Sequence, residues 1–221
     1  MRRGGLASNL LKDDDGASFV EFTVVFPLLF MATLGLVDLG LLMFGWSDAN
    51  RAVQLGVRYA ATRDPVATGI DGPIDPTNAS IPTGTYCTDS AGNTFCILKP
   101  TYRCSGATGK CTAISGVGNE KPIDMTKFGD LVTLMRPFVR TLNNSQVVVT
   151  YAPLQQGYVG RTSTPMNVTV AFNCVGQPLY FAGALLGWGF PSWNECTGVA
   201  NSDGIKFDIS ATLPSEDLST N

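Results

Sequence analysis

One carboxylate lies where a long apolar segment begins, and a glycine five residues earlier suggests how it is neutralised. Residues 17–46 are almost entirely apolar, and Glu21 is near their start. A carboxylate at the edge of a lipid-embedded helix costs a few kcal/mol unless it has a partner. Cleavage after Gly16 would give Ala17 a free amine one helical turn before Glu21. We therefore predict that this amine and the carboxylate neutralise each other, in one chain or between neighbouring copies.

Six cysteines form the second candidate set, and all of them lie beyond the apolar segment. An even number confined to one side of a membrane is typical of disulfides in an oxidising compartment. The alternative is reduced or metal-bound thiols, but zinc sites favour shorter spacings between paired cysteines. Six cysteines allow fifteen pairings. The pairs that we predict are Cys87–Cys96, Cys104–Cys111 and Cys174–Cys196.

The rest of the composition gives no sign of catalysis or of a cofactor. The 221 residues include no histidine, which removes the commonest general base and metal ligand. No P-loop, dinucleotide-binding glycine motif or zinc ligand set is present. The formal charge of −3 does not favour nucleic acid as a partner. We therefore expect no catalytic residue, no metal, no cofactor and no enzymatic activity.

The apolar segment is long enough to cross a lipid bilayer as a helix. We place the span at residues 22–46, and an amphipathic stripe of small residues extends the helix to Arg63, before Asp64-Pro65. Pro27 removes one backbone hydrogen bond and predicts a kink, either an ordinary transmembrane one or a point that helps the subunit leave the bilayer. Asp38 is expected near the far interface, where it reaches headgroups or awaits a partner in an assembly.

The residues after the helix predict one α+β domain. Residues 64–124 are rich in Pro, Gly, Thr and Ser, which favours irregular structure with short strands. Residues 125–142 have helical periodicity, with Asp124 as the N-cap and a bend or break at Pro137. An antiparallel sheet resting on the long helix is predicted from three segments rich in β-branched and aromatic residues: 146–151, 166–173 and 205–213.

A second apolar segment, residues 178–193, lies between the last two predicted strands. It is short for a second span, and glycines and a proline interrupt it. Two readings remain open: a disulfide-tied loop and short helix that cover the sheet, or an exposed patch that docks another subunit.

The sequence G16-A-S-F-V-E21-F-T-V-V-F-P27 lies at the N-terminal end of a predicted apolar helix. It resembles the start of type IV pilins, and most of all that of the TadE-type pseudopilins of the Flp/Tad pilus. Ala17 departs from the phenylalanine that many pilins carry at the first mature position. The resemblance implies a type IV pilin-like fold. Its parts would be a leader (residues 1–16), a long helix (17–63) and an extracytoplasmic, disulfide-rich α+β domain (64–221).

The same resemblance implies processing by a prepilin peptidase and assembly with TadE-like or TadF-like subunits on a Tad inner-membrane platform. A single span would anchor the protein in the cytoplasmic membrane, with its C-terminal domain in the periplasm, until it enters an extracellular pilus. We expect a minor pilin or pseudopilin that takes part in assembly, priming or tip structure, and hence in surface adhesion. The alternative is a permanently anchored extracytoplasmic binding protein or adhesin, which needs neither Gly16 nor Glu21.

Overall fold

The computed structural model describes residues 14–97, 99–116, 118–154, 156–177 and 205–215. Of the described residues, 14–43 belong to one compact unit, and 44–177 with 205–215 belong to a second. The sheet, the short helices and the C-terminal part of the long helix belong to the second unit. The apolar N-terminal part of the long helix, up to Met43, belongs to the first unit.

The long helix α2 covers Asp14–Thr62 without interruption. It ends one residue before the predicted Arg63, because a residue that precedes proline, here Asp64, disfavours the helical conformation. It begins three residues before the predicted start at Ala17.

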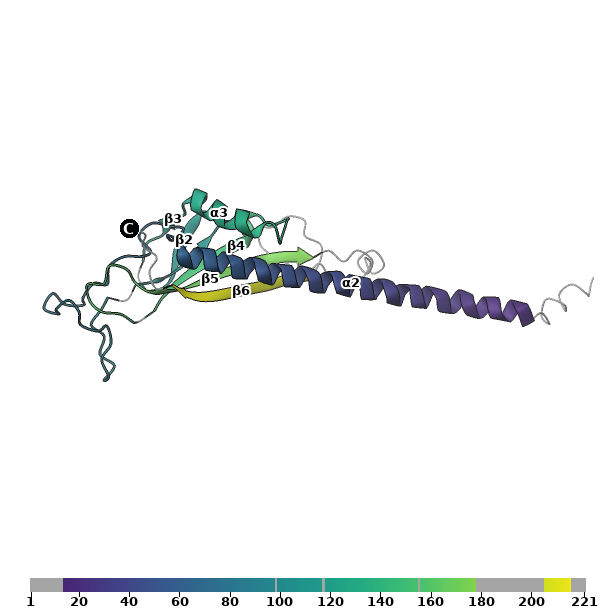
Figure 1. Cartoon of the computed structure of the whole chain (residues 1–221), viewed down its shortest axis with the longest axis horizontal. Coiled ribbons are helices and arrows are strands. Elements are labelled where there is room, and N and C mark those ends of the chain that lie inside the picture. The colour runs from purple at the N-terminus through teal and green to yellow at the C-terminus, as the bar shows by residue number, and fades with distance from the viewer. Residues whose placement is uncertain (1–13, 98, 117, 155, 178–204, 216–221) are drawn as a thin grey trace, which may run out of the picture. The chain divides into compact units, whose positions relative to one another are not determined.

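A six-stranded antiparallel sheet has the spatial order β3-β2-β1-β4-β5-β6. Its strands β4, β5 and β6 are labelled in Figure 1. Its strands are β1 (Thr101–Ser105), β2 (Lys110–Ser115), β3 (Lys121–Pro122), β4 (Val147–Pro153), β5 (Met166–Gln177) and β6 (Ile205–Ser215). The last three are the strands predicted from β-branched and aromatic residues, and each extends beyond its predicted C-terminal end. The first three lie in the segment predicted to hold short strands, so the antiparallel α+β prediction is confirmed.

The short helix α3 (Met125–Met135) begins where the sequence predicted, but it stops before Pro137 and does not continue to residue 142. The carboxylate of Asp124 accepts hydrogen bonds from the backbone N–H groups of Thr126 and Lys127, as an N-cap does. The helix ends at Met135 because Pro137 cannot donate the next backbone hydrogen bond. A 3₁₀ turn, η1 (Asn144–Gln146), then leads into β4.

The core of the second unit joins α2, α3 and one face of the sheet. The small-residue stripe of α2 is buried, as predicted: Ala49, Ala52, Val53, Gly56, Val57 and Ala60. The alanines and valines of this stripe share one apolar cluster with Phe128 of α3 and with Tyr151 and Phe172 of the sheet. Glycine is needed at position 56, because a Cβ there would lie 2.5 Å from Sδ of Met135. Small side chains therefore set the close approach of α2 to its neighbours.

The opposite face of the sheet is polar, which confirms the alternation seen in the last two predicted strands. Thr150, Thr169 and Thr212 lie opposite one another on β4, β5 and β6. The hydroxyl oxygens of Thr169 and Thr212 are 2.7 Å apart and form a hydrogen bond. The sheet is therefore amphipathic, with its apolar face on the helices.

Candidate assembly site and disulfide-tied loops

The N-terminal part of α2 presents an apolar surface with no covering from the described residues. Side chains 19–33 are all exposed, and this helix is long and apolar enough to cross a membrane. Phe22, Phe26 and Phe30 stack along it, with ring centroids 5.4 and 6.1 Å apart (aromatic neighbours at i and i+4). By length and composition this surface suits lipid or the apolar helices of other subunits.

Glu21 lies on this exposed helix, next to the first phenylalanine of the aromatic row. Within the described part of the chain, no hydrogen bond or ion pair is recorded for its carboxylate. Gly16 and Ala17 are part of the α2 backbone, and their side chains lie outside the described set. Ala17 and Glu21 are four residues apart in a helix, so they share one face. Neutralisation by an amine at Ala17 stays a prediction.

Pro27 lies inside α2, as predicted. Its ring nitrogen has no proton, so the carbonyl of Thr23 lacks its usual helical donor. Two threonine hydroxyls in this part of the helix donate hydrogen bonds to backbone carbonyls. The hydroxyl of Thr23 donates to the carbonyl of Phe19 at 2.7 Å, and that of Thr33 donates to the carbonyl of Phe30 at 2.8 Å. Both hydroxyls are thereby satisfied within the helix, which lowers the cost of placing them in lipid. The predicted kink remains untested.

Asp38 differs from its predicted environment. Its side chain is 3% exposed, and it is the single buried residue among residues 19–43. Asp38, Ala49 and Ala60 are spaced by eleven residues, or about three helical turns, so they lie on one face of α2. A carboxylate that reaches into headgroups would be exposed, so this reading does not describe the structure. The sequence gives one signal for the burial, the alignment of Asp38 with the small-residue stripe.

Two of the three predicted disulfides are confirmed. Cys87–Cys96 and Cys104–Cys111 are bonded, with Cα–Cα distances of 4.9 and 3.9 Å. Cys104 and Cys111 lie opposite each other on β1 and β2 and enter the main core. Cys174 lies on β5, but its side chain and Cys196 are outside the described residues, as is the apolar segment 178–193.

Cys87–Cys96 ties a set of loops that we call the loop module, residues 74–97 and 156–161. Ile74, Cys87, Cys96 and Val159 form a second apolar cluster, separate from the main core. Backbone hydrogen bonds join the two segments, including Ile74 N–H to Arg161 O and Cys87 N–H to Gly157 O, both at 3.0 Å. The module therefore has its own core and its own covalent cross-link.

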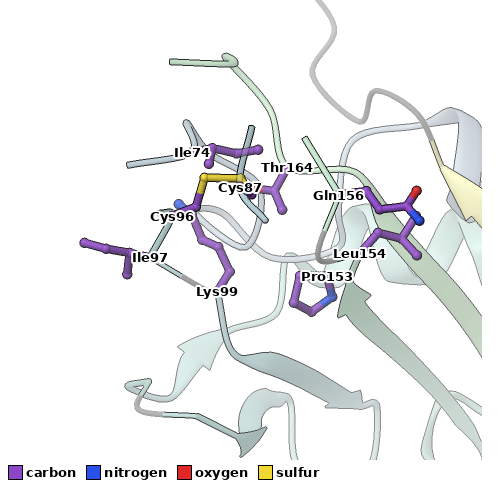
Figure 2. Close-up of a pocket in the computed structure, with 9 residues that line it drawn as sticks. All are labelled: Ile74, Cys87, Cys96, Ile97, Lys99, Pro153, Leu154, Gln156 and Thr164. Atoms are coloured by element: carbon purple, nitrogen blue, oxygen red, sulfur yellow. A yellow bond between two sulfur atoms is a disulfide. The ribbon is translucent and has the colours of Figure 1, made fainter. Parts of the chain in front are cut away.

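Two hollows lie on the second unit, and neither has the size of a typical small-molecule site. Figure 2 shows the first, where the Cys87–Cys96 bond lies among the lining side chains; its volume of about 20 Å³ suits one water molecule. The second, about 140 Å³, lies at the end of α2 beside α3. Lys127 there forms an ion pair with Asp64 at 3.2 Å, and Arg63 lies over the ring of Tyr59.

Metal binding finds no support in the part of the chain that the structure describes. No group of three or more His, Cys, Asp or Glu side chains there could hold a metal ion. Sequence reasoning missed two other features of the described residues, the aromatic row on α2 and the paired tyrosines of the loop module described below. The spacing of Phe22, Phe26 and Phe30 could have revealed the first.

Residues 16–58 match the family model described as TadE-like protein. The match begins at Gly16, includes Glu21 and the apolar part of α2, and ends within the buried stripe, before the sheet. It confirms the predicted resemblance over these residues. No curated protein and no solved structure matches the chain.

Proposed function

We propose that this protein, with its TadE-like N-terminal segment, is a minor pilin or pseudopilin of a Tad-type pilus. It would take part in pilus assembly, priming or tip structure, and through these in surface adhesion. One observation carries the proposal: the family match begins at Gly16, the residue before the predicted cut, and covers Glu21 and the apolar part of α2. A plain membrane anchor has no need of this combination.

In this proposal α2 anchors the subunit in the cytoplasmic membrane before assembly, with the sheet domain in the periplasm. A prepilin peptidase removes residues 1–16, and the new amine at Ala17 pairs with Glu21, in the same chain or in a neighbouring one. The exposed apolar side chains 19–33 then exchange lipid for helices of other TadE-like or TadF-like subunits on the inner-membrane platform. This exchange costs little, because lipid tails are as apolar as leucine side chains.

The first test is the intact mass of the protein, extracted from membranes of cells with and without an active prepilin peptidase. We expect a mature N-terminus at Ala17 only where the peptidase is active. A protein that keeps Met1 in both cells, or that is cut near residue 46, contradicts the proposal. Retention of the leader in a Gly16→Ala variant would show that the cut depends on the predicted residue.

The charge-pairing step is tested separately with variants of Glu21. Glu21→Gln keeps the size of the side chain but removes its charge, so it should be processed normally and enter pili at least about tenfold less well. Glu21→Asp should recover part of the incorporation, and Thr23→Val is a matched control on the same exposed surface. Normal incorporation of Glu21→Gln would show that the carboxylate does not act through its charge.

The loop module favours a second candidate function, a permanently anchored extracytoplasmic binding protein or adhesin. Its separate core and disulfide lie outside the TadE-like match and support a surface that recognises a ligand. The two candidates differ at the N-terminus, since a permanent anchor keeps its leader. The mass measurement therefore distinguishes them.

A further inference from the structure

The loop module carries two exposed tyrosines that lie side by side. The side chain of Tyr86 is 74% exposed and that of Tyr158 is 45% exposed, although both belong to a cross-linked part of the protein. Large aromatic side chains are normally buried, and exposed tyrosines are enriched where proteins meet ligands. The pair is separated by 72 positions in the sequence, so the fold brings it together.

Backbone hydrogen bonds fix the geometry of this pair. Tyr86 and Tyr158 form an antiparallel bridge, flanked by the bonds Cys87 N–H to Gly157 O and Val159 N–H to Thr85 O. This pattern defines a non-hydrogen-bonded pair, in which the Cα atoms are about 4.5 Å apart and both side chains leave the same face. Two phenol rings are therefore presented on one surface.

The residues on either side of the pair are held by the module's own core. Cys87 is buried and disulfide-bonded to Cys96, and Val159 is 2% exposed. Each tyrosine thus adjoins a buried residue of the second apolar cluster. A ligand that binds the rings would order little additional backbone, and this pre-organisation favours affinity.

The loop module is mostly polar and carries few charges. Its charged side chains are Asp75, Asp89 and Arg161. The Asp89 carboxylate is already occupied, because it accepts hydrogen bonds from the backbone of Ala91 and Asn93 and from the Asn93 amide. The hydrogen bonds from Asn93 hold the pKa of Asp89 below its usual range. The module also has exposed neutral donors and acceptors, among them those of Thr88, Thr94, Asn93 and Gln156.

We propose that the loop module binds a neutral polysaccharide through Tyr86 and Tyr158. A sugar ring has a face of C–H groups that packs on an aromatic ring, and a rim of hydroxyls that bind amide and hydroxyl side chains. The exposed rings and the many neutral polar side chains of the loop module match both parts of such a ligand. The hollow behind the disulfide holds only about one water molecule, so the ligand binds on the surface.

Other ligands fit these observations less well. Anionic polymers and nucleic acids need clustered basic side chains, whereas the loop module contains a single basic residue, Arg161. A stable protein partner needs about 800 Å² of surface on each side with an apolar centre, whereas many of the exposed residues of the loop module are Thr, Ser or Asn. The polysaccharide proposal does not depend on the role in pilus assembly, because it uses none of residues 16–58.

The test measures binding of the full chain, in detergent micelles, to immobilised polysaccharides. Neutral probes are a β-glucan and a galactomannan, and the anionic probe is alginate. We expect wild-type binding to at least one neutral probe that is insensitive to salt. Tyr86→Ala and Tyr158→Ala should each weaken it about tenfold, as expected for the loss of one aromatic contact. Tyr86→Phe, which keeps the ring, should bind nearly as the wild type does.

Ile114→Ala is the matched control, since Ile114 is 57% exposed on β2, outside the loop module. It should bind as the wild type does, and thermal unfolding of every variant checks that the fold is intact. Three results would overturn the proposal: no binding to either neutral probe, salt-sensitive binding to alginate alone, or unchanged binding by folded Tyr86→Ala and Tyr158→Ala.

Discussion

The side chain of Tyr151 holds the backbone just after the C-terminal end of α2. It is among the largest fully buried side chains, and its phenol oxygen accepts a hydrogen bond from the backbone N–H of Val66 at 3.2 Å. Val66 follows the proline that ends the helix, so this bond satisfies a buried donor at a turn. Burial raises the pKa of the Tyr151 phenol well above its ordinary value of 10.0, because the phenolate would lose its hydration.

Replacing Tyr151 by phenylalanine should destabilise the protein by about 1–3 kcal/mol, since the N–H of Val66 is then buried without a partner. A raised pKa in the folded state also means that stability is lost as the pH rises above 10.0, where the unfolded phenol ionises first. The variant should lose less stability over that alkaline range than the wild type does. Urea unfolding at pH 7 and from pH 9 to 11 measures both effects.

Tyr86→Phe provides the control for this prediction, because its hydroxyl is exposed and makes no recorded bond among the described residues. Its unfolding free energy should change by less than about 0.5 kcal/mol at neutral pH. Equal effects of the two substitutions would mean that the bond from Val66 to Tyr151 contributes nothing to stability.

At the scale of elements, the approach of α2 to α3 depends on the absence of one side chain. A Cβ at Gly56 would lie 2.5 Å from Sδ of Met135 and 3.5 Å from a methyl of Val170. Met135 is completely buried, so it has little room to move aside. The long helix can therefore pack against both α3 and the sheet only with glycine at this position.

Gly56→Ala should destabilise the protein, because overpacking of about 1–3 kcal/mol exceeds the gain of up to about 1 kcal/mol in helix propensity. The matched control is Gly129→Ala within α3, where nothing lies within 4 Å of the added Cβ. That change should stabilise the protein by roughly 0.5–1 kcal/mol. Chemical denaturation of the two variants should show opposite signs, and stabilisation by Gly56→Ala would contradict the packing argument.

At the scale of the whole molecule, the fold follows largely from local patterns in the sequence. The stripe from Ala49 to Ala60 gives the buried face of α2, and Asp124 with Pro137 gives the limits of α3. The alternation of apolar and polar residues in β5 and β6 gives the two faces of the sheet. These features are predictable because each depends on residues a few positions apart.

Features that join distant residues were not predictable in the same way. The spatial order of the six strands and the bridge between Tyr86 and Tyr158 are set by tertiary packing, which no short window of sequence records. Asp38 lies in the long helix as predicted, but its burial was not foreseen. Gly16 and Glu21 could be singled out from the sequence because the signal is a short spacing along one helix, and their roles in processing and assembly stay predictions.

The two described disulfides provide a test of how independent the two cores are. Cys87–Cys96 and Cys104–Cys111 join residues separated by 9 and 7 positions, so the chain-entropy model predicts similar stabilisation, about 2–4 kcal/mol each. They differ in location, because the first is in the core of the loop module and the second is in the main core. Removal of either disulfide should therefore lower the free energy of unfolding by a similar amount, but it should destabilise different parts of the protein.

Replacing both Cys87 and Cys96 by alanine should speed amide hydrogen exchange within the loop module, at Gly84 and Val159 for example, while Val149 and Val170 in the sheet stay protected. Replacing both Cys104 and Cys111 by alanine should lower protection across the sheet as well, because these residues are buried between β1 and β2. Hydrogen exchange of the full chain in detergent, read by mass spectrometry, distinguishes the two patterns. If both double variants exchange alike, the second unit unfolds as one body, and the loop module cannot open while the sheet remains folded.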